Sequence, residues 1–496
     1  MKKILGLVVI IAALVLGGYF GMGLITERTL KKNIEIVNQS TGFTVKIAQY
    51  DRHWFYSTAA VDVVVHVPEQ TQENQDGKIE KIPAKDYTLN LPVNIIHGPI
   101  IYTGTGVVFG LGYAKSDLTL PKELVDKVST YFAAQSTLPT LKLSVFVDYR
   151  NKSRFQLAVP GFKLMSKEGE NSAEWLGLTG DIDVSSDLKN ISGDFSLDGI
   201  KVLKDKMNGE LGKVTSDYAL HKTDDGLYVG YASVLLPSLL VTEDGKTLFD
   251  VSQFKIHTEN SVDKGLFESD FKTSVDKVLS KDKQYGPGLL ELSVKNLDAK
   301  VLARLNAQVN KIKHTSGAER QQTMFAMLPE LPKLLAQGAS FEISALKLTV
   351  PEGDIDGHFT IALPKTEAIN PFQIMQQIEG NGKFVVPSAI VKRVVTESLK
   401  QKNTAQNSLQ SAVLAEVNKD QPVQENKEST KETATAAPDT AAADQQAAAD
   451  ADTKIAALLQ SKILIVDGQN YQLEFHLSKG KLTVNGQPFD PATFKF

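Results

Sequence analysis

Apolar and polar residues alternate along most of this chain, and this alternation limits the fold more than any other feature of the sequence. Between Val61 and Val67 every second residue is valine, and similar patterns recur at Leu141–Val147, Phe359–Leu363 and Tyr471–Leu477. A strand with this pattern buries one face and exposes the other. Many such strands, separated by Gly, Asp, Asn and Lys turns, predict an antiparallel sheet that is either curved and open or closed as a sandwich. The similar hairpins of Ser172–Thr273 predict one long meander.

A few segments depart from this pattern and predict helices packed on the sheet. Pro121–Gln135 begins with a proline in its first turn. Asp298–Lys313 carries an apolar stripe at helical spacing, with Asp298 as its N-cap. Gln321–Gln337 is expected to be kinked or split by its two prolines, and Ser388–Val417 looks helical with one polar side. The fold class we predict is therefore α+β and β-dominated.

The N-terminus carries an uncharged run, Ile4–Ile25, directly after Lys2 and Lys3. As a helix this run is about 30 Å long, which is the thickness of the hydrocarbon core of a bilayer. We expect residues 1–25 to form a signal anchor, a transmembrane helix that holds the rest of the chain outside the cytoplasm. Two alternatives stay open, namely a signal peptide cleaved near Gly21–Gly23 and a buried helix of a soluble protein.

Three further regions follow the predicted anchor. Residues 26–418 are expected to form a β-rich periplasmic domain. Residues 419–452 are rich in Ala, Gln, Glu, Asp, Lys and Thr and contain no aromatic residue. Such a segment buries too little apolar surface to fold, so we expect a disordered linker. Residues 453–496 are expected to form a C-terminal hairpin that docks on the main domain, with Asn485 and Gly486 as its turn.

The residues that commonly carry chemistry are sparse or scattered. The chain has no cysteine, which excludes thiolate metal sites, iron–sulfur clusters and cysteine nucleophiles. Its 8 histidines lack ligand spacing, and the net charge of -4 argues against nucleic-acid binding. There is no phosphate-binding loop, zinc-protease motif or nucleophile elbow. We therefore expect no catalytic residue, no cofactor and no metal. Hydrolysis by two carboxylates that the fold brings together is the enzymatic alternative.

Two short clusters stand out from the background. The first, Tyr50–Ser57, is densely aromatic with Arg52 in its middle. It forms either a recognition surface, in which arginine stacks on rings, or the corner between two strands with its aromatic residues in the core. The second contains His97, Gly98 and Pro99 and predicts a turn after a strand. In that turn His97 either bonds the backbone or serves a site.

These clusters, in this order after one apolar helix, resemble the YdgA/YihF-like family of bacterial proteins of unknown function. The family's aromatic-arginine motif, Y-x-R-G-x-F-x-S, is matched by Tyr50, Arg52, Phe55 and Ser57, with His53 in place of the glycine. Its H-G-P turn and closing N-G hairpin are matched at residues 97–99 and 485–486. The resemblance implies an inner-membrane protein that faces the periplasm. It implies no enzyme activity, no cofactor and no catalytic residue.

From these features we expect a non-enzymatic envelope protein anchored in the bacterial inner membrane, acting as a scaffold or accessory factor. The alternative is that it binds lipid or another hydrophobic envelope component in a β-groove, because an apolar sheet face that no helix covers must be covered by another apolar molecule or surface. The expected partners are the membrane, through residues 4–25, a lipid or envelope protein, and a second copy of the chain. Nucleic acid is not among them.

Overall fold

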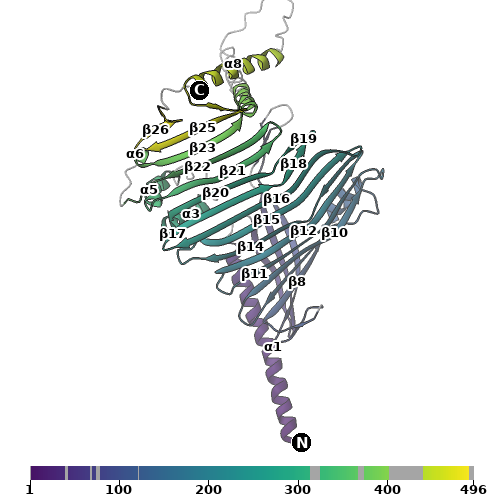
Figure 1. Ribbon diagram of the computed structural model, residues 1–496. Helices are drawn as coiled ribbons and strands as arrows, with labels where there is room; N and C mark the ends of the chain where they lie inside the picture. Colours follow the sequence, from purple (N-terminus) through teal and green to yellow (C-terminus); the bar gives the residue numbers. More distant parts are fainter. Residues whose placement is uncertain are drawn as a thin grey trace, which may run out of the picture. The chain divides into compact units, whose positions relative to one another are not determined.

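The computed structural model describes residues 2–38, 43–67, 70–73, 79–104, 106–120, 122–312, 324–366, 374–401 and 440–490. Within these ranges, the side chains of residues 2–14, 32–33, 36–37, 43, 70–73, 79–82, 123, 310–312, 374–375 and 440–443 lie outside the description. The chain divides into two compact units, and each is described by itself. Unit 1 comprises residues 1–282 and 296–335, and unit 2 comprises residues 283–295 and 336–496. Figure 1 labels their helices and strands.

Unit 1 is built on an antiparallel meander, in which most strands pair with the strand that follows them in the chain (Figure 1). Its strands are β1 (Phe43–Arg52), β2 (Tyr56–Val67), β5 (Lys85–His97), β8 (Gly112–Thr119), β9 (Thr140–Val147), β10 (Ser153–Met165), β11 (Ser172–Val184), β12 (Asn190–Lys204), β13 (Met207–Leu211), β14 (Val214–Lys222), β15 (Tyr228–Glu243), β16 (Lys246–Asp263), β17 (Leu266–Val275) and β18 (Lys277–Ser280). Two small hairpins accompany them, β3 (Gln70–Glu73) with β4 (Ile79–Ile82) and β6 (Ile101–Tyr102) with β7 (Val107–Val108). The run from β11 to β17 confirms the meander predicted for Ser172–Thr273.

The helices of unit 1 agree with the sequence pattern in type and approximate position. They are α1 (Lys2–Val37), α2 (Lys122–Tyr131), α3 (Ala299–Ile312), a helical segment at residues 324–327, a 3-10 turn η1 (Leu328–Glu330) and α5 (Leu331–Leu335). Asp298 caps α3 as predicted, because its Oδ1 accepts a hydrogen bond of 2.9 Å from the Val301 backbone N–H. The predicted kink between the two prolines is present as the change from η1 to α5.

Unit 2 is also built of antiparallel strands. Its strands are β19 (Lys283–Tyr285), β20 (Gly288–Asp298), β21 (Ser340–Val350), β22 (Gly353–Ala362), β23 (Glu379–Pro387), β24 (Ile465–Asp467), β25 (Asn470–Ser478), β26 (Lys481–Val484) and β27 (Gln487–Phe489). The order from β20 to β23 follows the chain, and β25 then pairs with β23, so the C-terminal strands return to the sheet. A bulge between Ile343 and Leu346 matches the slip in their alternation.

The helices of unit 2 differ from the sequence prediction in one place. They are the short α6 (Ile374–Gln377), a helix at residues 388–401, and α8 (Thr440–Gln460). Residues 440–452 were predicted to belong to a disordered linker, whereas α8 begins at Thr440. Ala447, Ala451 and Ile455 form a buried stripe along α8, because small side chains allow close packing. The rest of the predicted linker, residues 419–439, lies outside the described residues.

The N-terminal segment forms a single helix, α1, across the predicted boundary between residues 25 and 26. Its second half packs on β1, β5 and β8 of unit 1. Over the part of the chain that the structure describes, no helix combines the length and the apolar character needed to cross a membrane.

Candidate functional site

The two sequence clusters meet around α1. One face of this helix carries Tyr19, Gly23, Thr26 and Leu30, which are three or four residues apart and therefore form one stripe. The stripe lies against the β1–β2 turn and the turn that follows β5. The two turns are joined to each other by the hydrogen bond from the His97 backbone N–H to the Phe55 carbonyl, 3.3 Å long. The clusters thus form one surface that receives the helix, which we call the helix seat (residues 50–57 and 97–100).

Tyr19 is the most closely held side chain of α1 at the seat. Its ring meets the ring of Phe55 edge-on, with centroids 5.1 Å apart, and its hydroxyl donates to the Ile100 carbonyl at 3.0 Å. Gly98 lies directly beneath the ring. A Cβ atom at Gly98 would stand 2.0 Å from the Tyr19 ring, and the φ of +133° is one that L-residues rarely adopt. The glycine of the H-G-P turn is therefore required both for its backbone and for the close approach of Tyr19.

His97 lies at the centre of the seat and is fully buried. Gly23 of α1 passes so close that an added Cβ would lie 2.7 Å from the imidazole Cε1. Burial lowers the pKa of His97 below 6.5, and the backbones of Tyr56 and Tyr19 offset part of this shift. Neither ring nitrogen completes a hydrogen bond of good geometry with any residue that the structure describes. His97 is thus held as a neutral, tightly packed side chain.

The side chains of Tyr50 and Ser57 form a second group of buried polar atoms at the seat. Ser57 is fully buried, and the hydroxyl of Tyr50 approaches it without either group completing a hydrogen bond of good geometry. Burial raises the pKa of Tyr50, and its interaction with Ser57 opposes that shift. Burial therefore favours the protonated form of the Tyr50 hydroxyl.

Charged side chains lie at the edge of the helix seat. Arg52 pairs with Glu27 of α1 at 3.3 Å and lies over the ring of Phe20, 5.2 Å from its centroid. Trp54 packs against the same ring at 5.4 Å. His53, which replaces the family glycine, has no positive φ and stacks on Tyr56 at 4.5 Å. The seat therefore does not need a glycine at this position.

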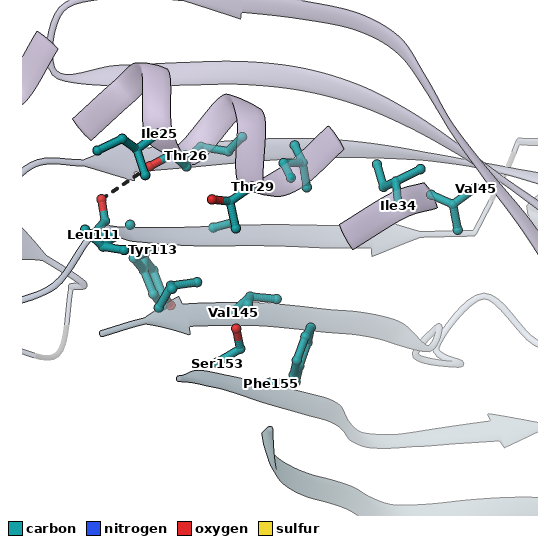
Figure 2. Close-up of a pocket in the computed structure, with 15 residues that line it drawn as sticks. Ile25, Thr26, Thr29, Ile34, Val45, Leu111, Tyr113, Val145, Ser153 and Phe155 are labelled. Carbon is teal, nitrogen blue, oxygen red and sulfur yellow. Dashed lines mark hydrogen bonds between the residues drawn. The ribbon is translucent and has the colours of Figure 1, made fainter. Parts of the chain in front are cut away.

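An apolar cavity of about 230 Å³ lies next to the seat, under the second half of α1. Figure 2 shows Ile25, Thr29 and Ile34 of the helix facing strands that carry Val145 and Phe155. Thr26 at its edge donates to the Leu111 carbonyl at 3.3 Å (Figure 2). The lining is almost entirely hydrocarbon, and the cavity is partly open.

Strand register explains why the floor of the cavity is apolar. Residues directly opposite in antiparallel strands point to the same face of the sheet. One such row crosses five strands, and its members are Ile95, Ala114, Val145, Phe155 and Ile182. The first four line the cavity, and Ile182 continues the row onto β11 beyond it. The cavity is therefore the covered end of an apolar row that continues onto β11.

The opposite face of the same strands is charged. Arg154 of β10 bonds Asp183 of β11 through Nε at 2.9 Å, and Lys152 reaches the same carboxylate at 3.0 Å. The hydrogen bond from Arg154 is the largest of several causes that lower the pKa of Asp183. At the cavity the sheet thus has one face suited to hydrocarbon and one suited to water.

Among the described residues, no group of three or more His, Cys, Asp or Glu side chains has the geometry to hold a metal ion. The seat itself contains no pair of groups arranged as nucleophile and base. Of its charged side chains, Arg52 pairs with Glu27 of the helix and Asp51 accepts a hydrogen bond from Gln49 of β1. The motif residues of unit 1 that the sequence singled out are Tyr50, Arg52, Phe55, Ser57, His97, Gly98 and Pro99, and the structure brings all of them together at the seat.

A family model described as a bacterial protein of unknown function (DUF945) matches residues 1–492. The chain belongs to this family. No curated protein matches the chain, and no solved structure does. The family match thus covers both units, the helix seat and the cavity of this DUF945 protein.

The remaining motif of this DUF945 protein lies in unit 2. Asn485 adopts a φ of +47° in the turn before Gly486. Its amide group donates to the carbonyls of Lys462 and Ile463, and its Oδ1 accepts from the Glu474 backbone N–H. Asn485 and Gly486 therefore build a turn and do not contribute to the seat.

Sequence reasoning missed the residues of α1 that fill the seat and those that line the cavity. Gly23 was the available signal, because a glycine inside an apolar helix commonly marks close packing. The cavity residues gave no local signal, since Ile95, Ala114, Val145 and Phe155 come from four different strands.

Proposed function

We propose that this DUF945 protein binds the acyl chain of a lipid, or a similarly apolar envelope component, in the cavity beneath α1. The observation that carries the proposal is the cavity itself, about 230 Å³ in volume and lined almost wholly by hydrocarbon. An apolar cavity of about 150 Å³ in another protein stays dry and takes up benzene. The larger cavity here has room for a segment of an alkyl chain.

The shape of the site favours a long, thin ligand. The cavity is partly open, and its floor continues as an apolar row onto β11. Phe155, at the open side of that row, is 38% exposed, which is unusual for an aromatic side chain on an inner sheet face. An acyl chain that leaves the cavity along this row covers Phe155 and Ile182. A compact ligand would leave them in water.

The same proposal places the protein at the bacterial inner membrane, single-pass, with its bulk in the periplasm. The support is the uncharged run Ile4–Ile25, which belongs to α1, the same helix whose second half roofs the cavity. A lipid-binding site beside a membrane anchor is close to its source of ligand. The closer kinship with YdgA/YihF-like proteins belongs to this proposal too and is supported by the motifs that form the seat.

The test compares two substitutions on neighbouring residues of β8. Ala114→Phe places a ring inside the cavity, whereas Lys115→Phe places the same ring on the opposite, exposed face. The full chain of each variant is purified in detergent, and co-purifying lipid is quantified by mass spectrometry. Lipid bound around α1 is common to both variants, so their difference reports the cavity.

We expect Ala114→Phe to lose most of the cavity-bound lipid and Lys115→Phe to retain the wild-type amount. Circular dichroism of both variants checks that the sheet is intact. Equal lipid content in a folded Ala114→Phe variant contradicts the proposal. That result would favour the scaffold or accessory role, because such a role needs no ligand in the cavity.

A further inference from the structure

A cluster of exposed apolar side chains lies on the β1–β2 turn and on the segment between β5 and β8, the two parts of the chain that contact α1 at Tyr19 and Phe20. Its members are Trp54, Phe55, Ile100, Tyr102, Val107 and Phe109, and each is between 48% and 65% exposed. Isolated apolar residues on a surface are normal, but a cluster of this kind marks a site of interaction with a membrane or another protein. We call this cluster the apolar ring.

Contacts hold the ring against the helix. Trp54 packs on Phe20, and Phe55 packs on Tyr19. Tyr19 also donates to the carbonyl of Ile100, directly before the β6–β7 hairpin. The Gly98 backbone N–H donates to the Leu111 carbonyl, which closes the loop that carries the other members. The ring therefore has a fixed position relative to α1.

The helix itself continues the apolar surface. Val15 and Leu16, one turn before Tyr19, are both 43% exposed. The ring and this part of α1 thus form one apolar region, and the uncharged sequence continues back to Ile4. A protein partner on the ring would have to enclose the helix as well. A lipid bilayer meets both at once.

We infer that the apolar ring seats the base of unit 1 in the interfacial layer of a lipid bilayer, with Trp54 among the acyl chains and headgroups. The inference rests on the membrane placement proposed above. The chemistry supports this occupant, since the ring combines a tryptophan and a tyrosine with aliphatic residues and phenylalanines. Tryptophan and tyrosine are the residues that concentrate at membrane interfaces. The ring and α1 would together fix how the domain stands on the membrane, whereas a helix alone would leave it free to tilt.

The chain contains 2 tryptophans, which allows a direct test. Trp54 belongs to the ring. Trp175 is half-buried on β11, opposite Phe162 of β10. The stretch of β10 from Ser153, at the cavity, to Phe162 spans about 30 Å at the rise of a strand. Trp175→Phe leaves Trp54 as the single reporter, and Trp54→Phe leaves Trp175 as the matched control.

The full chain of each variant is reconstituted into vesicles of phosphatidylcholine and phosphatidylglycerol, with and without phosphatidylcholine brominated on its acyl chains. We expect Trp54 to lose most of its fluorescence in the brominated vesicles and Trp175 to keep its fluorescence. Circular dichroism confirms that both variants are folded.

Flotation and a carbonate wash test the membrane anchor separately from the apolar ring. If the chain floats with vesicles and resists the wash, but bromine quenches Trp54 no more than Trp175, the ring inference is overturned and the anchor stands. The ring inference is also overturned if Trp54 is shielded from acrylamide without being quenched by bromine, because a protein or a second copy then covers it. If the chain does not float with the vesicles, the proposed membrane placement and the ring inference both fail.

Discussion

Replacing Gly98 with alanine tests whether α1 is held in the helix seat as the structure shows. Two costs add at this position. The φ of +133° is strained for alanine, at about 1–3 kcal/mol. The new Cβ would also stand 2.0 Å from the Tyr19 ring, so the ring must move away. Its contact with Phe55 and its hydrogen bond to Ile100 are then lost, at about 0.5–1.5 kcal/mol each. The expected loss is about 2–6 kcal/mol in the free energy of unfolding.

Two comparisons isolate the steric part. Gly104→Ala is the matched control, because Gly104 has a φ of +90° but open space around it, so only backbone strain is expected. In a Tyr19→Ala background, Gly98→Ala should likewise cost only its backbone strain. The assay is urea unfolding of the full chain in detergent, followed by far-UV circular dichroism.

The close packing of Tyr19 on Gly98 is refuted if Gly98→Ala costs no more stability than Gly104→Ala. It is refuted equally if the cost of Gly98→Ala is the same with and without the Tyr19 ring. Either result would mean that α1 does not lie on the H-G-P turn.

Two more predictions concern single residues. Burial holds the pKa of His97 in the folded chain below the unfolded value of 6.5. As the pH falls below 6.5, His97 is therefore protonated in the unfolded chain before it is protonated in the folded chain. The stability that neutral His97 contributes is complete above pH 6.5, and it falls by up to about 1.4 kcal/mol per pH unit between pH 6.5 and the folded pKa. Urea unfolding at several pH values should show this slope, and His97→Gln should reduce the slope. Asn485→Ala should destabilise unit 2 by about 3 kcal/mol, because it strains a φ of +47° and removes three hydrogen bonds. Asn485→Gly should cost less, since glycine relieves the strain, and equal costs in thermal melts would contradict the role of the turn.

Much of the fold could be predicted from local patterns. Alternating apolar residues such as Val61 and Val63 on β2 located the strands because the side-chain period of a strand is two. The Asp298 cap was also predicted, since it depends on neighbouring residues alone. The Ala-rich α8 was missed because its composition resembles that of a linker. Its buried stripe becomes visible only against the rest of unit 2.

The site was predicted only in part, for a physical reason. The sequence singled out the seat residues because aromatic side chains, arginine and an H-G-P turn are conspicuous. It left open whether they form a recognition surface or a structural corner, and the structure shows them holding a helix. An apolar helix such as Ile4–Ile25 has the same composition whether it meets lipid or a sheet, so the contacts of Tyr19 and Gly23 could not be read from it. The cavity arises only when four strands align.

The most direct test of the account is photo-crosslinking in living cells with benzoyl-phenylalanine on β9. Val145 lines the cavity, and Lys142 lies on the opposite face of the same strand. After irradiation and purification under denaturing conditions, we predict that intact-mass spectrometry finds a lipid-sized adduct on the Val145 variant and none on the Lys142 variant. A folded Val145 variant without a lipid adduct, or with no more adduct than the Lys142 variant, would contradict the claim that an acyl chain occupies the cavity.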